Sequence, residues 1–150
     1  MLPTPAAGPD SRPDEDAGPD QTQVLLALAQ TCENAGFGQQ TGCLVAACEL
    51  LGCRWRENYP DPWDEMFNLA HGYALAGAHE SAVLAMMPAS STFTGGRLAD
   101  GSVIAQVLLA PGAAAHSRGA RWLAMAWLAA LLRAAAQHTD PADTLQETRK

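Results

Sequence analysis

One apolar run limits the possible folds of this chain more than any other part of its sequence. It extends over eleven residues from Trp122 to Leu132, between Arg121 and Arg133. If the run is helical, apolar side chains lie on nearly every side of the helix, which must then be covered on several sides. We therefore predict a long apolar C-terminal helix over about 117–138, buried by the rest of a domain or by a partner. Because a membrane-spanning helix needs roughly 20 apolar residues, we expect no membrane insertion.

The composition agrees with one folded domain. The chain has 150 residues, of which 48% are hydrophobic and 17% charged, and this length is enough to bury one core. Sixteen acidic residues against nine basic ones give a formal net charge of -7. Because nucleic-acid binding needs clustered cations, we expect no nucleic-acid partner. The sequence does not begin with a basic region followed by an apolar stretch, so we expect a cytoplasmic protein.

Three segments of different composition divide the chain. Residues 1–20 contain five prolines and five acidic residues but a single arginine. This composition predicts a disordered acidic leader. Residues 21–138 are predicted to form a single helical domain, and residues 139–150 a polar tail.

The four cysteines give no sign of a metal site. Cys43, Cys48 and Cys53 are spaced five residues apart, so on one helix they point in different directions. No CxxC pair occurs, and without an export signal we expect a reducing compartment. We therefore interpret the cysteines as small buried side chains and expect no metal or other cofactor.

Start and stop signals predict two helices in the first third of the chain. Asp20 and Gln23 have the spacing of a capping box before an apolar stripe. The glycine-rich segment 36–38 ends this first helix. A second helix is predicted over 39–51, with Gly52 at its end.

The clearest start signal follows an irregular stretch at 54–60. Asp61 is expected to cap a third helix whose first position is occupied by Pro62. Gly77 is expected to end that helix and to reverse the chain. A fourth helix is then predicted over 79–87, before a proline.

Residues 90–110 allow two interpretations. Asp100 and Gly101 suit the tight turn of a β-hairpin over about 92–109. Alternatively, Asp100 caps a short helix over 103–109. Because residues that are not β-branched interrupt the strand pattern, the sequence slightly favours the helix.

A faint repeat relates the two predicted helical hairpins. In each, a Leu-Ala pair is followed by a buried contact one turn later and then by a glycine at the turn. The matched positions, 41 residues apart, are Leu28, Ala29, Cys32 and Gly36 in the first hairpin and Leu69, Ala70, Tyr73 and Gly77 in the second. The small residue permits close helix packing, and the glycine tolerates the turn.

The second hairpin, over 63–88, resembles a tetratricopeptide repeat. It places residues of that family's types at the family's spacings: Leu69, Ala70, Tyr73, Gly77, Ala82 and Met86. The resemblance implies a mainly α fold of antiparallel helical hairpins. Pro88 departs from the family because it ends the second helix early, and Thr41 stands where the first copy should have an alanine. No third copy is visible, so the last helix is expected to cap the array.

A narrower resemblance is to the small chaperones of type III secretion systems. These short bacterial proteins are similar in the order of their hairpins, which precede a helix like Trp122-Leu123-Ala124. The resemblance implies a cytoplasmic chaperone that keeps a partner helix covered.

The repeat assigns a partner-binding groove to the first helix of each hairpin. The expected groove residues are Gln23, Leu26, Gln30 and Glu33 in the first hairpin and Asp64, Phe67, His71 and Ala74 in the second. The same spacing also suits a compact core around Leu26 and Phe67. We further expect Trp122 and Trp127 to contact a protein partner or a second copy of the chain, in a hetero- or homo-oligomer.

No catalytic motif is present, such as HExxH or GxSxG. We therefore expect a non-catalytic adaptor or chaperone that binds a helical segment of another protein. An alternative comes from 103–111 and Arg118-Gly119-Ala120, which are similar to the acyl-CoA-binding strand, loop and helix of acetyltransferases. That similarity implies an enzyme using acetyl-CoA, although Arg121 occupies the place of the second small residue.

Overall fold

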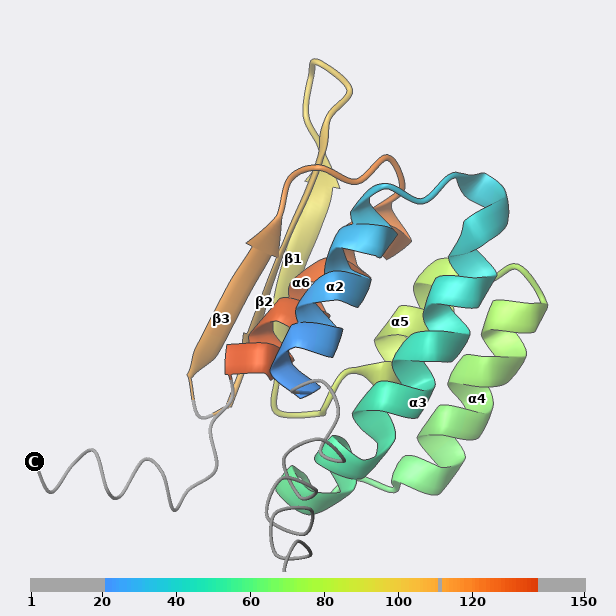
Figure 1. Cartoon of the computed structure of the whole chain (residues 1–150), viewed down its shortest axis with the longest axis vertical. Helices are drawn as coiled ribbons and strands as arrows, with labels where there is room; N and C mark the ends of the chain where they lie inside the picture. The colour runs from blue at the N-terminus through green and yellow to red at the C-terminus, as the bar shows by residue number, and fades with distance from the viewer. Residues whose placement is uncertain (1–20, 111, 138–150) are drawn as a thin grey trace, which may run out of the picture.

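The computed structural model describes residues 21–110 and 112–137. These residues form five α-helices, a short 3-10 helix and one sheet of three antiparallel strands (Figure 1). In chain order the elements are α2 (Gln21–Glu33), η2 (Phe37–Gln39), α3 (Gln40–Asn58), α4 (Trp63–Leu75), α5 (His79–Met86), β1 (Thr92–Arg97), β2 (Val103–Leu109), β3 (Ala113–Ser117) and α6 (Leu123–Gln137). The fold is mainly helical with a small sheet. The predicted leader over 1–20 and tail over 139–150 lie outside the described residues.

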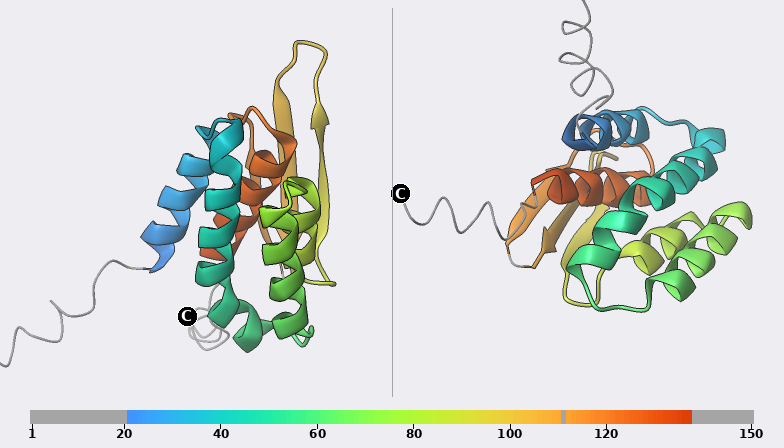
Figure 2. Two further views of the ribbon diagram at one scale, coloured as in Figure 1. Left: turned by 90° about the vertical axis from the view of Figure 1, so that its right-hand side faces the viewer. Right: turned by 60° about the horizontal axis from the view of Figure 1, so that its bottom comes forward.

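Helix α6 lies at the centre of the fold, between the sheet and the other helices (Figures 1 and 2). It packs against β2 and β3 on one side and against α2 on another. Helices α3 and α5 also contact α6, whereas α4 lies outside and packs against α3 and α5. Apolar side chains of α6 such as Met125, Leu128 and Leu131 are consequently fully buried. Within the described ranges, no helix is long and apolar enough to cross a membrane.

The long C-terminal helix predicted over 117–138 is not observed. Ser117 ends strand β3, and the fifteen-residue helix α6 begins only at Leu123. The segment before Ser117 is a strand because it pairs with β2 and alternates between buried and exposed residues. Ala115 and Ser117 thereby turn toward the core. Residue 138 lies outside the described residues.

Strands β1 and β2 form a β-hairpin, which was one of the two interpretations of residues 90–110. The helix over 103–109, which the sequence slightly favours, is therefore wrong. The antiparallel pairing of the two strands places Arg97 opposite Val103. Asp100 and Gly101 lie in the turn, where Gly101 has a φ of 91°. Burial alternates along β2 with a period of two, and one side of this strand packs on α6. This packing outweighs the interrupted β-branched pattern, because strand preference depends mostly on packing context.

Helix α3 continues past Gly52, where the sequence predicted its end. It runs on to Asn58, so most of the stretch over 54–60 is helical rather than irregular. The reason is Trp55, which is fully buried and whose indole Nε1 donates a hydrogen bond to the carbonyl oxygen of Met86 at 2.6 Å. Burial of a large apolar side chain stabilises by about 2–3 kcal/mol, which exceeds the roughly 1 kcal/mol that a helical glycine costs.

The α4–α5 hairpin has the predicted reversal. Gly77 has a φ of 82°, which favours glycine, and α5 ends before Pro88. The start of α4 differs from the prediction. Pro62 is the N-cap residue, and the carboxylate of Asp61 instead accepts a hydrogen bond from the backbone N–H of Ala89 at 2.9 Å. Asp61 therefore ties the start of α4 to the segment after α5.

Candidate functional sites

The predicted groove face of α4 is turned partly toward α3. The carboxylate of Asp64 accepts a hydrogen bond from the guanidinium of Arg56 on α3 at 2.7 Å. Ala74 is buried, and its carbonyl oxygen accepts a hydrogen bond from a threonine of α3 at 3.1 Å. Phe67 packs half-buried against the core, and His71 is exposed. Phe67 and Ala74 are thus packed within the chain, whereas Asp64 and His71 remain exposed.

The four groove residues predicted on α2 have different surroundings. Gln23, Leu26 and Gln30 are exposed, whereas Glu33 is half-buried and contacts α6 and β3. Helix α3 lies between α2 and α4 (Figures 1 and 2). The structure therefore does not bring the two predicted sets together on one surface, and the binding of a partner by either set stays a prediction.

Trp122 and Trp127, predicted to contact a partner, pack within this chain. Trp127 Nε1 donates a hydrogen bond to the carbonyl oxygen of Thr94 at 3.2 Å, and its ring meets Phe93 edge to face at 5.5 Å between centroids. Trp122 lies just before α6 and meets the ring of Phe37 at 5.3 Å in the same manner. Both indoles remain partly exposed, so a partner can still reach their edges.

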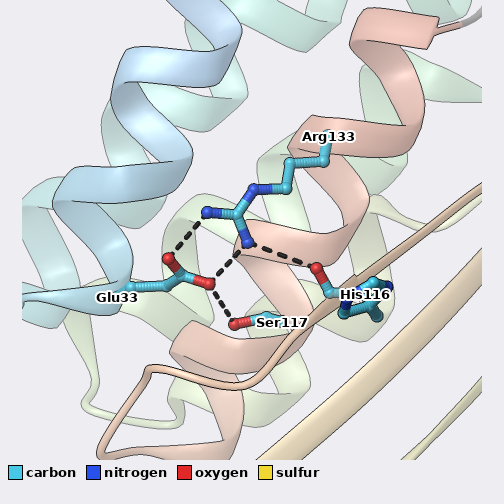
Figure 3. Close-up of polar contacts among 4 residues, drawn as sticks. All are labelled: Glu33, His116, Ser117 and Arg133. Atoms are coloured by element: carbon cyan, nitrogen blue, oxygen red, sulfur yellow. Dashed lines mark hydrogen bonds and ion pairs between the residues drawn. The ribbon is translucent and has the colours of Figure 1, made fainter.

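A polar cluster joins α2, β3 and α6 (Figure 3). The guanidinium of Arg133 donates hydrogen bonds to both carboxylate oxygens of Glu33, with a distance of 2.6 Å from Nη2 to Oε1. The hydroxyl of the buried Ser117 donates to the same carboxylate at 2.6 Å, and the carbonyl oxygen of His116 accepts from Arg133 at 3.2 Å. Such bidentate charge-assisted contacts are strong and directional.

The electrostatics of this cluster indicate a structural role. Hydrogen bonds from Arg133 and then from Ser117 hold the pKa of Glu33 below its ordinary value, although burial opposes the shift. The carboxylate in turn raises the pKa of Arg133. Glu33 is therefore ionised and fully occupied at neutral pH, which leaves it unsuited to proton transfer. It clamps the end of α2 to the central helix.

A cavity of about 570 Å³ opens where η2, α5, the β1–β2 hairpin and the start of α6 meet. Aromatic side chains form part of its wall. The ring of Phe37 meets Trp122 edge to face, and it meets His79 in the same way at 5.8 Å. The buried Gln40 and the exposed Arg97 also line the cavity. Its volume lies in the range of small-ligand sites, and its lining mixes aromatic with charged and polar side chains.

The orientation of His79 follows from its hydrogen bonds. Thr41 donates its hydroxyl hydrogen to the carbonyl oxygen of Ala74. Because that hydroxyl hydrogen is already used, His79 Nε2, which lies 3.3 Å from the same hydroxyl oxygen, donates a hydrogen bond to it. This contact holds the ring of His79 in the wall of the cavity.

Sequence reasoning missed this cavity. In the sequence, Phe37 lies in the glycine-rich segment 36–38 that ends the first predicted helix. Arg97 lies in residues 90–110, which allow either a β-hairpin or a helix. A large aromatic residue between two glycines is a signal of an exposed ring, because it cannot join the stripe of a helix. The other lining residues come from elements far apart in the sequence and leave no local pattern.

Two buried thiols face each other across α2 and α3. Cys32 shares a hydrogen bond with Cys43, and this bond lowers the pKa of Cys43 to about 7. The same bond, with burial, raises the pKa of Cys32. Cys32 and Cys43 are buried, as expected of packed side chains. Cys48 is half-buried and Cys53 is exposed, so the interpretation of the cysteines as buried side chains is wrong for Cys53.

The outer side of α4 carries exposed apolar residues. Leu69 is 54% exposed and Tyr73 is 40% exposed, and they are four residues apart on the helix. Residues at this spacing are neighbours on a helix surface. The repeat predicted a buried contact at Tyr73, and this prediction is wrong, because the structure leaves both side chains open to solvent.

The strand, loop and helix expected for acyl-CoA binding are interrupted in the structure. Strand β2 is followed by β3, and Arg118 and Gly119 lie between β3 and α6 rather than at the first turn of a helix. A Cβ built on Gly119 would lie 3.7 Å from the carboxyl carbon of Glu33. The carboxylate beside this glycine disfavours a bound pyrophosphate.

Comparison with models of protein families, with curated proteins and with solved structures found no match to this chain. Within residues 21–110 and 112–137, no three His, Cys, Asp or Glu side chains are grouped to hold a metal ion. The outer side of α4 and the aromatic cavity are two features available for function.

Proposed function

We propose that this protein is a non-catalytic adaptor or chaperone whose α4–α5 hairpin binds an amphipathic helix of its partner. The observation that carries the proposal is the exposure of Leu69 and Tyr73 on the outer side of α4. Neighbouring apolar side chains on an exposed helix suit a partner helix that presents its own apolar face. Helices α3 and α5 pack against α4.

The negative charge of the α4–α5 hairpin indicates which charge the partner helix carries. The α4–α5 hairpin contains Asp64, Glu65 and Glu80 but no lysine or arginine. Asp64 already pairs with Arg56, so Glu65, four residues before Leu69, provides the free negative charge beside the apolar pair of α4. Because complementary charges orient partners and exclude wrong ones, the bound helix carries basic residues beside its apolar face.

The two family resemblances support a narrower form of this proposal. A tetratricopeptide-like hairpin and a type III secretion chaperone both bind segments of other proteins. In this form the protein is cytoplasmic, and its partner is an aggregation-prone subunit of a secretion apparatus whose helix is kept covered. Identification of the captured partner decides between the narrow and the broad form.

Quantitative capture from lysate of the native cell tests the proposal. Leu69→Asp places a charge in the apolar surface and reduces recovery of the specific partner at least tenfold. Leu98→Asp is the matched control, because Leu98 is 47% exposed but lies near the tip of the β1–β2 hairpin. Equal recovery by wild type and both variants would overturn the proposal.

Cross-linking identifies the bound segment. The cross-linked peptide of the partner is expected to form an amphipathic helix with Lys or Arg beside its apolar face, and binding is expected to weaken as salt is added. Phe67→Asp is unsuitable as a probe. Phe67 packs on Trp63 at 5.4 Å and against the core, so its loss disturbs the fold as well as the surface.

A further inference from the structure

We propose that the cavity between Phe37, His79 and Trp122 binds a small zwitterion with an aromatic ring, of the chemical class of an aromatic α-amino acid. The cavity measures about 570 Å³, within the range of small-ligand sites. It lies apart from Leu69 and Tyr73, which do not line it. The proposal is therefore independent of partner binding by α4.

The aromatic side chains in the wall of the cavity favour a ligand that has an aromatic ring. Phe37 is 64% exposed although it contacts Trp122 and His79. An exposed aromatic residue between two others offers both a face and edges to an incoming ring, and such pairs stabilise by about 0.5–1.5 kcal/mol beyond area burial. A ring in the cavity covers this surface.

Two polar groups in the wall have unused hydrogen-bonding capacity. The Nε1–H of Trp122 is buried and has no hydrogen-bond partner among the described residues. Gln40 is only 2% exposed, and its Nε2 donates one long hydrogen bond of 3.4 Å to the carbonyl oxygen of Phe37. A buried N–H without a partner, such as that of Trp122, is costly and calls for an acceptor. The carboxylate of a ligand supplies one.

The charges in the wall select a zwitterion. Arg97 and Glu80 both line the cavity, and within the described part of the chain they form no ion pair with each other. Arg97 Nη1 donates to the carbonyl oxygen of Gly101 at 3.1 Å, which leaves its other N–H groups for a carboxylate. Glu80 attracts an ammonium group and repels a simple anion. A ligand with a carboxylate and an ammonium therefore suits the site better than an anion or a cation.

Calorimetric titration of the full chain with L-tryptophan tests the proposal. Three further probes each lack one recognised group: indole-3-propionate has no ammonium, tryptamine has no carboxylate, and L-alanine has no ring. We expect saturable binding of L-tryptophan and at least tenfold weaker binding of each other probe. Absence of saturable binding overturns the proposal, and so does an affinity for indole-3-propionate or tryptamine equal to that for L-tryptophan.

Variants of Arg97 and Glu80 test whether these two side chains bind the charged groups of the ligand. Arg97→Gln is expected to weaken L-tryptophan binding about tenfold, whereas Arg121→Gln, in an exposed arginine that does not line the cavity, leaves it unchanged. Glu80→Gln weakens L-tryptophan binding but strengthens that of indole-3-propionate, because it removes the repulsion of the carboxylate. Both surface arginine variants should fold, which far-ultraviolet circular dichroism checks. Equal effects of the two arginine variants overturn the assignment.

Discussion

Gly95 lies where β1 passes over the indole of Trp127. A Cβ built there would come within 2.6 Å of Trp127 Nε1, 3.1 Å of the carbonyl oxygen of Ile104 and 3.2 Å of a methyl carbon of Leu123. A real Cβ does not approach the atoms of neighbouring groups so closely, so the strand or the indole must move. The close contact between β1 and α6 therefore depends on the absence of a side chain at this position.

Gly95→Ala is expected to lower the free energy of unfolding by about 1–3 kcal/mol, the usual cost of overpacking. Gly96→Ala is the matched control, since among the described residues no atom beyond those of its chain neighbours lies within 4 Å of a Cβ at that position. We expect it to change stability by less than about 0.5 kcal/mol. Urea unfolding of both variants measures the difference, and equal stabilities would show that β1 does not lie this close to Trp127.

Glu33 makes stability depend on pH. Its pKa is lowered in the folded protein, chiefly by Arg133, so the ion pair stabilises above the unfolded value of about 4.3. This contribution is lost as the pH falls through the lower folded value. Glu33→Gln is expected to cost about 1–3 kcal/mol at neutral pH because it leaves Arg133 poorly paired.

The pH dependence of the difference between wild type and Glu33→Gln checks this prediction. The advantage of wild type should shrink as the pH falls below about 4.3. Glu49→Gln is the control, because Glu49 is exposed on α3 and its loss should change little at any pH. A wild-type advantage that stays constant into acid contradicts the account of the cluster.

At the scale of single elements, turn and capping residues in the sequence predicted some ends of helices correctly and others wrongly. The reversal at Gly77 was predictable because a positive φ favours glycine at that position. The continuation of α3 past Gly52 was not predictable, because it depends on the burial of Trp55 beside Met86, thirty-one residues away. The same holds for β2, whose strand conformation depends on packing against α6.

Gly52 provides a test of the continuous helix α3. Inside a helix, Gly52→Ala is expected to raise stability by about 0.5–1 kcal/mol because alanine is the better helix former. Among the described residues, and apart from the backbone of the helix itself, a Cβ there would contact Nη1 of Arg56 at 3.3 Å, the movable end of a long side chain. At a helix end with positive φ the same change would lower stability. Thermal unfolding gives the sign, and a lower midpoint would mean that α3 ends near Gly52.

At the scale of the whole molecule, α6 is covered by the sheet on one side and by helices on the other (Figure 2). The need to cover an apolar C-terminal segment was predictable from its sequence. Strand β3, which helps to cover it, was not predictable, because Ala113–Ser117 carries no strand pattern of its own. Neither the aromatic cavity nor the separation of α2 from α4 was predictable, since both arise only when distant elements pack together.

The central claim is that the outer side of α4 is the surface that contacts a partner. Hydrogen–deuterium exchange of the full chain, alone and with the cross-linked partner as a purified protein, tests it most directly. We predict slower exchange in α4, over Trp63–Leu75, on addition of the partner, and unchanged exchange in β1 to β3. Slower exchange confined to the strands, or no change in α4, would contradict the claim.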